Sequence, residues 1–202
     1  MRFIASPVET CHGASLQTKK KITKTIIMPE FVVLVDTHDN KIGLMEKQAA
    51  HVNPTLHRAF SIFIFNSKGE MLLQQRALTK YHTPGLWTNT CCSHPRDGES
   101  LEQATKRRLM EEMGMECELK EAFSFIYKAD VMQGLTEHEF DHVFIGTTDA
   151  IPIINREEVE SYKYETIENI KKDIEKNPQN YTAWFKIAFA KLLDSSHLRR
   201  SE

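Results

Sequence analysis

A thiol and an imidazole lie two residues apart in the segment 88–95, which reads Thr-Asn-Thr-Cys-Cys-Ser-His-Pro. If this segment is an extended strand, Cys92 and His94 point to the same face, because successive side chains alternate between the two faces of a strand. A thiol can move a proton or attack a carbon atom, and an imidazole can bind a metal ion. The pair therefore predicts a pocket for proton-transfer, nucleophilic or metal chemistry, whereas Cys91 is predicted to face the opposite side and pack in the core.

Further potential metal ligands lie in two other segments. His51 and His57 flank the start of an apolar run, and one residue separates Glu137 from Glu139, so both carboxylates face the same side of a strand. Together with His94, these groups suit a divalent ion such as Zn²⁺, Mn²⁺ or Mg²⁺, and imidazole ligands favour the first two. Scattered His and Glu residues are common, and their spacing alone leaves open whether the three segments meet.

The alternation of apolar runs and turns predicts the elements that must position these groups. A helix is predicted to begin after Ser100, which forms a capping-box pattern with Gln103, and to end at Gly114. Strands interspersed with helices in one domain indicate an α/β or α+β fold. The predicted strands cover residues 31–35, 57–65, 71–75 and 87–94, then residues near 117–127, 137–146 and 160–165. Two further helices are predicted at residues 167–176 and 183–194.

Composition and charge narrow the class of protein. The 202 residues suffice for one domain with a substantial core, and the net charge of −2 gives no general attraction to nucleic acid or to an anionic membrane. No apolar run approaches the roughly 20 residues that a membrane-spanning helix needs. Since two of the four cysteines are adjacent, they make a poor disulfide framework, and free thiols in the cytoplasm are expected.

The two ends of the chain differ from its centre. Residues 1–27 are rich in Ser, Thr and Lys with little periodicity, and they are predicted to form a flexible arm. Residues 28–197 are predicted to form a single domain, followed by a short tail at 198–202. We expect a monomer that binds a small molecule, with a homodimer left open.

The helix predicted after Ser100 carries a charge pattern that is typical of phosphate chemistry. It has the spacing of a Nudix box at Glu99, Arg107, Glu111, Glu112 and Gly114. Two positions depart from that motif: Ser93 replaces its leading glycine, and Arg108 replaces the Glu that follows the first Arg. That Glu is a metal ligand in Nudix hydrolases, so its loss is expected to impair metal-assisted attack by water. The added guanidinium instead suits a site that binds a diphosphate without cleaving it.

From about residue 31 to residue 193 the chain resembles type I isopentenyl-diphosphate Δ-isomerases, and the short spacing from Pro95 to Arg107 is similar to that of bacterial members. The resemblance implies a Nudix-type mixed β-sheet sandwich flanked by helices. It also implies interconversion of isopentenyl diphosphate and dimethylallyl diphosphate by protonation and deprotonation, a 1,3-allylic shift in isoprenoid biosynthesis. The matching segments are Trp87 to Pro95, Leu56 to Ser61, Arg76 to Leu78, Glu137 to Glu139 and Ala183 to Phe185, together with His51.

The resemblance further implies a role for each matching residue. The implied catalytic residues are Cys92, Glu139, Tyr127 and Trp184, of which the two aromatic ones lie at the hydrocarbon end. One divalent ion, Mn²⁺, Zn²⁺ or Mg²⁺, would be bound by His51, His57, His94, Glu137 and Glu139. Glu112 matches a carboxylate that helps to hold Mg²⁺ with the substrate diphosphate. Contacts to that diphosphate are implied for Lys47, Arg76, Lys80, Ser93 and Arg108.

Two other functions compete with this interpretation. One is a Nudix pyrophosphohydrolase acting on a nucleoside diphosphate derivative, which Arg108 and the Cys92–His94 pair argue against. The other is a non-enzymatic module in which the histidines hold a structural metal. The remaining histidines, among them His82 and His142, are expected to be surface or structural residues.

Overall fold

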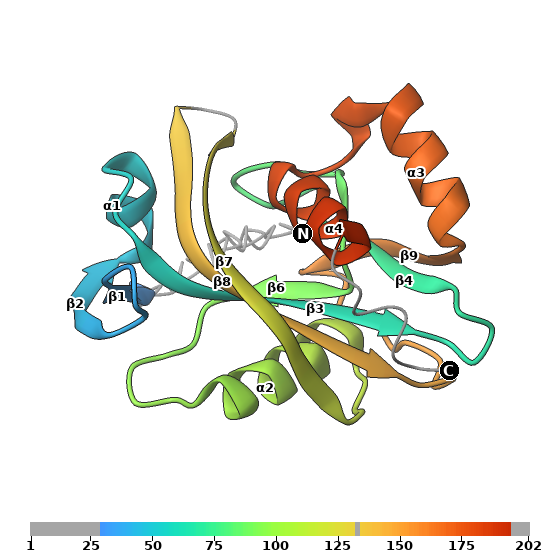
Figure 1. Ribbon diagram of the computed structural model, residues 1–202, viewed down its shortest axis with the longest axis horizontal. Helices are drawn as coiled ribbons and strands as arrows, with labels where there is room; N and C mark the ends of the chain where they lie inside the picture. Colours follow the sequence, from blue (N-terminus) through green and yellow to red (C-terminus); the bar gives the residue numbers. More distant parts are fainter. Residues whose placement is uncertain (1–28, 132–133, 195–202) are drawn as a thin grey trace, which may run out of the picture.

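Strands that carry or border most of the potential ligands pair around one central strand, β3 (His57–Phe65), in a mixed sheet (Figure 1). The structure is a computed structural model, and it describes residues 29–131 and 134–194, so the predicted arm at 1–27 and tail at 198–202 lie outside the described residues. Strand β8 (Leu135–Thr147) runs parallel to β3 along its whole length, and β6 (Cys91–Ser93) runs antiparallel to it. These two pairings bring together residues far apart in the sequence.

The remaining strands extend the sheet on both sides. β1 (Phe31–Val35) pairs with β3 and with β2 (Lys41–Glu46), and β7 (Leu119–Val131) pairs with β8. β4 (Met71–Arg76) pairs with β3, β5 (Trp87–Thr88) and β9 (Val159–Glu165). The helices are α1 (Lys47–Val52), α2 (Leu101–Met113), α3 (Ile167–Lys176) and α4 (Ala183–Asp194), with a short 3₁₀ turn at Pro178–Asn180.

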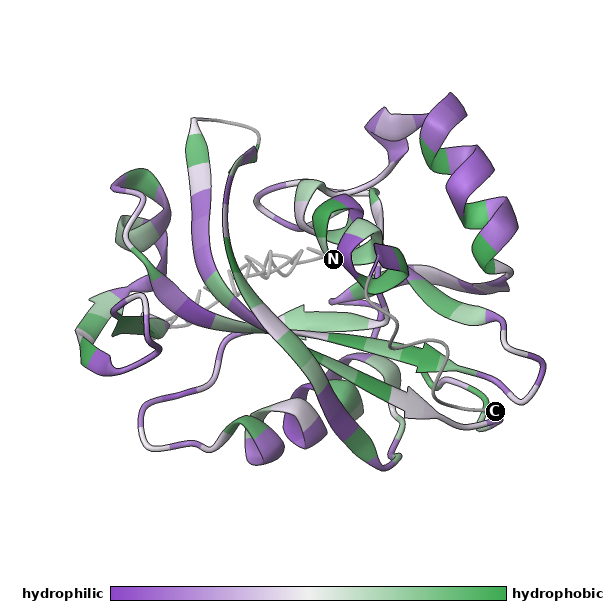
Figure 2. Ribbon diagram, viewed as in Figure 1, coloured by the Kyte–Doolittle hydropathy of each residue, from purple (hydrophilic) through white to green (hydrophobic). Residues whose placement is uncertain are grey.

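Helices cover both faces of the sheet and enclose two apolar clusters. On one face, Phe185 of α4 packs against Phe63 of β3, and Phe189 packs against Phe185 in the same cluster. On the other face, Leu109 and Met113 of α2 pack in a second cluster that includes Cys91. Figure 2 shows hydrophobic residues along the central strands and on α4, while α3 is mostly hydrophilic. The predicted mixed sheet flanked by helices is therefore confirmed, and Cys91 lies in the core as predicted.

The predicted strand at 87–94 is wrong in one respect, because it is two strands, β5 and β6, interrupted at Asn89 and Thr90. The side chains of these two residues replace ladder hydrogen bonds: Asn89 Nδ2 donates to the Cys91 carbonyl at 2.8 Å, and Thr90 Oγ1 donates to the Leu72 carbonyl at 2.7 Å. Such local side-chain bonds compete with regular strand pairing. The break leaves Cys92 on a short strand of its own, next to β3.

Two elements, β2 and α1, were not predicted from the sequence. Strand β2 lies at the edge of the sheet and is largely exposed, so it lacks a buried apolar stripe. Helix α1 has only six residues and depends on Glu46, whose carboxylate accepts hydrogen bonds from the backbone of Gln48 and Ala49. This helix carries His51, so a short, capped element positions one of the potential ligands.

Helix α2 begins and ends as predicted. Ser100 and Gln103 form the reciprocal capping box, and Gly114 ends the helix in the left-handed conformation with φ 60°. The Ile153 amide donates to the Met113 carbonyl at 2.8 Å, so the segment that follows β8 closes over the end of the helix. This contact anchors the chain that leads to Glu158.

Replacing Gly114 with Ala is expected to destabilise the protein more than replacing Gly69. Both glycines have positive φ, 60° and 76°, so either Ala incurs the left-handed penalty of about 1–2 kcal/mol. At Gly114 the new Cβ would also lie 2.5 Å from the Ile153 carbonyl oxygen, whereas nothing lies within 4 Å at Gly69. Gly114→Ala should therefore lower the free energy of unfolding in urea by about 1–3 kcal/mol more than Gly69→Ala. Equal losses would contradict this account.

Candidate active site and metal centre

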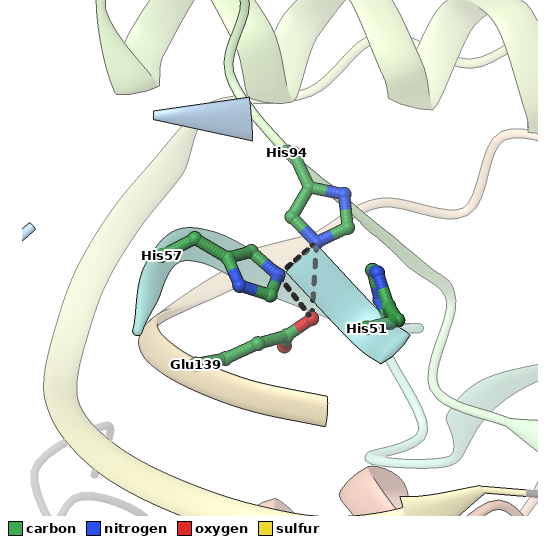
Figure 3. A group of neighbouring side chains, drawn as sticks. All are labelled: His51, His57, His94 and Glu139. Atoms are coloured by element: carbon green, nitrogen blue, oxygen red, sulfur yellow. Dashed lines mark hydrogen bonds and ion pairs between the residues drawn. The ribbon is translucent and has the colours of Figure 1, made fainter. Parts of the chain in front are cut away.

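Three histidines and one carboxylate meet on one face of the sheet (Figure 3). His57 lies opposite Glu139 in the parallel register of β3 and β8, His94 directly follows β6, and His51 comes from α1. Nε2 of His94 lies 3.2 Å from Nε2 of His57 and 3.0 Å from Oε1 of Glu139. One potential ligand atom from each of the four residues lies within 4.8 Å of the others. The structure therefore brings together residues from all three segments.

The hydrogen bonds of the rings indicate that this cluster suits a cation. Nδ1 of His51 lies 2.6 Å from the Lys47 carbonyl oxygen, and Nδ1 of His57 lies 2.8 Å from that of Thr55. A carbonyl oxygen only accepts, so each Nδ1 carries a proton and each ring turns its Nε2 towards the cluster, where a lone pair can bind a cation whenever that nitrogen carries no proton. Nitrogen and carboxylate ligands held about 2.0–2.2 Å from one ion are roughly 3.0–3.5 Å apart. The spacings among His57, His94 and Glu139 are 3.2, 3.0 and 3.6 Å, so these three groups suit a divalent metal ion.

Burial and charge perturb the acidic groups next to this cluster. Although burial by itself raises it, the hydrogen bonds and charges of His57 and His94 hold the pKa of Glu139 well below its ordinary value. For Glu137, burial and the neighbouring Glu139 raise the pKa well above the ordinary range. The Tyr127 hydroxyl lies 2.9 Å from Glu137 Oε2 and 2.7 Å from Glu139 Oε2. Since a phenol carries one proton, a neutral Glu137 can donate to Tyr127 while Tyr127 donates to Glu139.

Glu137, the fifth predicted metal ligand, lies outside the cluster that the other four predicted ligands form. It lies on the same face of β8 as Glu139, as the period of a strand requires, and it lines the same cavity. The four-residue group of ligand atoms does not include it. Its observed partner is Tyr127.

Cys92 opens into a cavity of about 200 Å³ that the cluster also lines. On β6 it lies opposite Ser61 of β3, and its side chain packs on the α4 side of the sheet, whereas that of Cys91 packs on the α2 side. Burial raises the pKa of the Cys92 thiol to about 12. Tyr127, Glu139 and Trp184 line the same cavity. All four residues predicted to be catalytic therefore border one space.

The basic residues predicted to bind a diphosphate line this cavity too, and most of them contact acidic side chains. Lys47 Nζ lies 2.9 Å from Glu30, Lys80 contacts Glu158, and Arg108 lies 3.3 Å from Glu158. Arg108 also donates to Glu112 at 2.5 Å. The region is therefore rich in charges of both signs.

Arg76 is held in a different way. Its Nε and Nη2 donate to the carbonyl oxygens of Thr83 and His82 at 3.2 Å, and its guanidinium lies 5.2 Å from the ring centre of Trp184. Ser93, the remaining residue predicted to contact the diphosphate, lines the cavity next to Cys92.

Several residues of the site were missed from the sequence. His82 is buried beside Trp184 and His51, although it was expected to be a surface or structural residue. Burial is the main cause that lowers the pKa of His82 to about 3, and the positive charge of Arg76 acts in the same direction. The position of His82 in the site depends on the geometry of its loop, so no spacing of residues in the sequence indicated it. His142, in contrast, is structural as expected, since it lies 3.1 Å from Asp39 and 2.6 Å from Glu121. Gln74, Glu30, Glu158 and Tyr81 also line the cavity and were missed.

Comparison with known proteins first defines the class. The sequence pattern of the NUDIX domain family matches residues 55–185. A solved protein of Deinococcus radiodurans has a similar fold, with a TM-score of 0.62, 21% identity and coverage of 73% of this chain and 90% of that one. A MutT protein from Methanosarcina mazei gives a TM-score of 0.56 at 20% identity, covering 67% of this chain and 91% of that chain. The fold and the site thus define a Nudix domain with a cluster of side chains that could hold a metal ion.

More similar relatives narrow this class. The isopentenyl-diphosphate Delta-isomerase of Pectobacterium atrosepticum is 50% identical over 171 residues, which cover 85% of this chain and 96% of that protein. Isopentenyl-diphosphate Delta-isomerase 2 of Photorhabdus laumondii is 55% identical over 159 residues, covering 79% and 90% of the two chains. The chain therefore belongs to the isopentenyl-diphosphate Delta-isomerase family, which confirms the resemblance found in the sequence.

Two further observations bear on the environment of the protein. Within residues 29–131 and 134–194, no helix is long and apolar enough to cross a membrane. Cys91, Cys92 and Cys117 are free thiols.

Removing one ring of the cluster is expected to abolish tight metal binding. His57→Asn should weaken binding of Zn²⁺ or Mn²⁺ by more than about 100-fold, because losing a ligand costs at least as much as losing an outer-shell partner. Equilibrium dialysis with elemental analysis measures the effect. His138→Asn is the matched control, since His138 lies on β8 between the two carboxylates and its Nδ1 contacts the Pro54 carbonyl. Equal metal content in both variants would exclude the cluster as the binding site.

His82 is expected to make the fold sensitive to acid. Its folded pKa of about 3 lies below the ordinary 6.5, so its contribution to stability is present above pH 6.5 and is lost as the pH falls towards 3. One such group changes the free energy of unfolding by up to about 1.4 kcal/mol per pH unit. His82→Asn should flatten the fall in stability between pH 6.5 and 4, measured by urea unfolding. The exposed His38→Asn is the control, and parallel curves for all three proteins would refute the prediction.

Proposed function

We propose that this chain interconverts isopentenyl diphosphate and dimethylallyl diphosphate by protonating one carbon of the alkene and deprotonating the carbon two bonds away. The observation that supports this most strongly is the shared cavity of Cys92 and Glu139, which come from strands on either side of β3. The sequence relatives named above carry this activity in their names. No other described cavity combines a thiol, a carboxylate cluster and several cations.

The reaction needs two proton carriers because an unactivated alkene is a very weak base. Its protonation gives a tertiary carbocation-like state, which must form next to a strong acid and away from water. On one wall, the proton among Glu137, Tyr127 and Glu139 is the one to be donated. Burial raises the pKa of Glu137 and of Tyr127 in the free site, and a bound cation would make this proton more acidic. On the other wall, the sulfur of Cys92 accepts a proton as thiolate in one direction and donates it as thiol in the other. The raised pKa of Cys92 favours the thiol form in the free site.

A divalent ion fits the site as part of this proposal. His51, His57, His94 and Glu139 would hold it, and Mn²⁺, Zn²⁺ and Mg²⁺ are the candidate ions. When bound, such an ion supplies positive charge that fixes the orientation of the carboxylate and tunes its acidity. Tyr127 and Glu137 then retain the proton on the side of the cavity that faces the substrate. Glu137 would contribute as a ligand only after releasing Tyr127.

The diphosphate is proposed to bind at the basic end of the cavity. Lys47, Lys80 and Arg108 would exchange their contacts with Glu30 and Glu158 for contacts with phosphate oxygens. Arg76 and Ser93 add further donors, and Mg²⁺ held by Glu112 would offset the charge of the diphosphate. Because this end does not react, its binding energy serves to orient the hydrocarbon chain between the two walls.

Trp184 is proposed to protect the cation. It is only 3% exposed, so the ring closes the hydrocarbon end of the cavity against water. A π face next to a desolvated cation contributes on the order of 1–2 kcal/mol. The guanidinium of Arg76 already lies over the ring, so Trp184 also connects the diphosphate end to the reacting end.

The competing hydrolase function lacks support from the site. Arg108 takes the box position of a metal-binding Glu, and its guanidinium lies against Glu112, the remaining carboxylate. The positive charge of Arg108 repels the metal ions that Nudix hydrolases bind at this place to activate water. Because this chain belongs to a family of enzymes, the alternative of a non-enzymatic module with a structural metal is also disfavoured.

We also propose a cytoplasmic location and a monomer that takes one small-molecule substrate. The free thiols of Cys91, Cys92 and Cys117 support a reducing compartment. The net charge of −2 gives no reason to expect nucleic acid or an anionic membrane as a partner.

Replacing Cys92 with Ala is expected to remove the turnover but not the fold. Incubation with isopentenyl diphosphate in D₂O, followed by NMR, should show dimethylallyl diphosphate and incorporated deuterium for the wild type. Cys92→Ala should be slower by about 10²–10⁴-fold or more, as expected for a lost acid–base group. Cys91→Ala is the matched control, because the neighbouring thiol lies in the core on the other face and should affect stability instead. Phosphate release without the allylic product would favour the hydrolase, and unchanged turnover of Cys92→Ala would remove the thiol from the mechanism.

A further inference from the structure

Two buried polar atoms beside Glu112 have no hydrogen-bond partner. They are Oε1 of Gln74 and Nε of Arg108, and they belong to a group of four such side-chain atoms among the described residues. Gln74 is only 2% exposed on β4, and Arg108 lies on α2. Both side chains line the cavity. Buried polar atoms are nearly always paired in folded proteins, so atoms without a partner at the edge of a site need an explanation, such as a bound ion or water molecule.

Glu112 connects these two side chains. Nε2 of Gln74 donates to Oε2 of Glu112 at 3.0 Å, and Nη2 of Arg108 donates to Oε1 at 2.5 Å. The carboxylate therefore fixes the orientation of the Gln74 amide, because the opposite orientation would place the amide oxygen against a carboxylate oxygen. In the observed orientation the amide oxygen is left as a free acceptor. The guanidinium likewise keeps a free donor at Nε.

A free acceptor and a free donor require ligands of opposite character. An amide oxygen is a hard neutral ligand that suits Mg²⁺, which binds oxygen ligands and needs few protein carboxylates when a phosphate is present. A guanidinium N–H suits an anionic phosphate oxygen. A magnesium diphosphate supplies both partners at once, the cation for Gln74 and the anion for Arg108.

We propose that Gln74 is a further member of the metal–diphosphate subsite. Its Nε2 holds the Glu112 carboxylate in place, and its Oε1 offers the divalent ion a neutral oxygen ligand beside that carboxylate. The proposal rests on the proposed function only in that the substrate carries a diphosphate. It adds to the site a residue that has no charge and lies outside the Nudix box.

The test uses the full-length protein and inorganic pyrophosphate as the probe. Isothermal titration calorimetry measures pyrophosphate affinity over a series of Mg²⁺ concentrations, and also with no added Mg²⁺. Gln74→Met keeps the length of the side chain but removes both polar atoms. Added Mg²⁺ is expected to strengthen pyrophosphate binding, and Gln74→Met should raise the Mg²⁺ concentration that gives half of this increase by about tenfold. The affinity for pyrophosphate without added Mg²⁺ should stay the same. An unchanged Mg²⁺ requirement, or an equal loss in both conditions, would overturn the proposal.

A second variant separates a ligand from a residue that only supports Glu112. Gln74→Glu keeps an oxygen at this position and replaces the amide donor with a carboxyl group, which donates to Glu112 only while it is protonated. If Oε1 faces the ion, this variant should need no more Mg²⁺ than the wild type does. A Mg²⁺ requirement raised as far as that of Gln74→Met would exclude the ligand role. Gln75→Met is the control on the same strand, because Gln75 Nε2 donates to the Gly85 carbonyl instead, and its Mg²⁺ requirement should be unchanged.

The two proposals can fail independently of each other. Pyrophosphate binding requires no isomerisation, so a Gln74-dependent Mg²⁺ requirement in a protein that makes no dimethylallyl diphosphate would reject the proposed function alone. Isomerisation with an unaltered Mg²⁺ requirement in Gln74→Met would reject the role of Gln74 alone. Thermal unfolding of each variant confirms that the comparison is made between folded proteins.

Discussion

The register of β3 with its two neighbours is the constraint on which the site depends. Parallel pairing places His57 opposite Glu139, and antiparallel pairing with β6 places Cys92 opposite Ser61. Side chains alternate between faces, so a slip of one residue in either pair would turn the ligand or the thiol into the opposite core. The apolar clusters on both faces oppose such a slip, because they would have to exchange positions with polar groups. Packing of the core and chemistry of the site are therefore fixed by the same register.

The cavity is lined both by ion pairs and by aromatic side chains. Lys47, Lys80 and Arg108 contact Glu30, Glu158 and Glu112, so each cation has an acidic partner. Removing Arg108 would leave the buried carboxylate of Glu112 without this cation. Trp184 and Tyr127 line the same cavity as the Cys92 thiol. Arg76 connects the two sets, because it lies over the Trp184 ring and borders the same cavity.

Much of the site could be predicted because strand and helix periods are local. Period two placed Cys92 with His94 and Glu137 with Glu139, and the capping pattern placed α2 between Ser100 and Gly114. Other features depend on tertiary contacts that no local pattern encodes. Side-chain to backbone hydrogen bonds or burial hold three such features: the loop around His82, the break at Asn89 and Thr90, and the short helix α1. Gln74 reads as an ordinary strand residue until Glu112 is brought against it.

The central claim is that the thiol and the carboxylate act from opposite walls on a hydrocarbon chain between them. A crystal structure of the protein with Mg²⁺ and the saturated, unreactive isopentyl diphosphate tests this claim most directly. The account predicts that the five-carbon chain lies between Cys92 Sγ on one side and Glu139 with Tyr127 on the other, with its diphosphate among Lys47, Lys80 and Arg108. A hydrocarbon chain bound outside this cavity, or one that meets the thiol and the carboxylate on the same face, would contradict it.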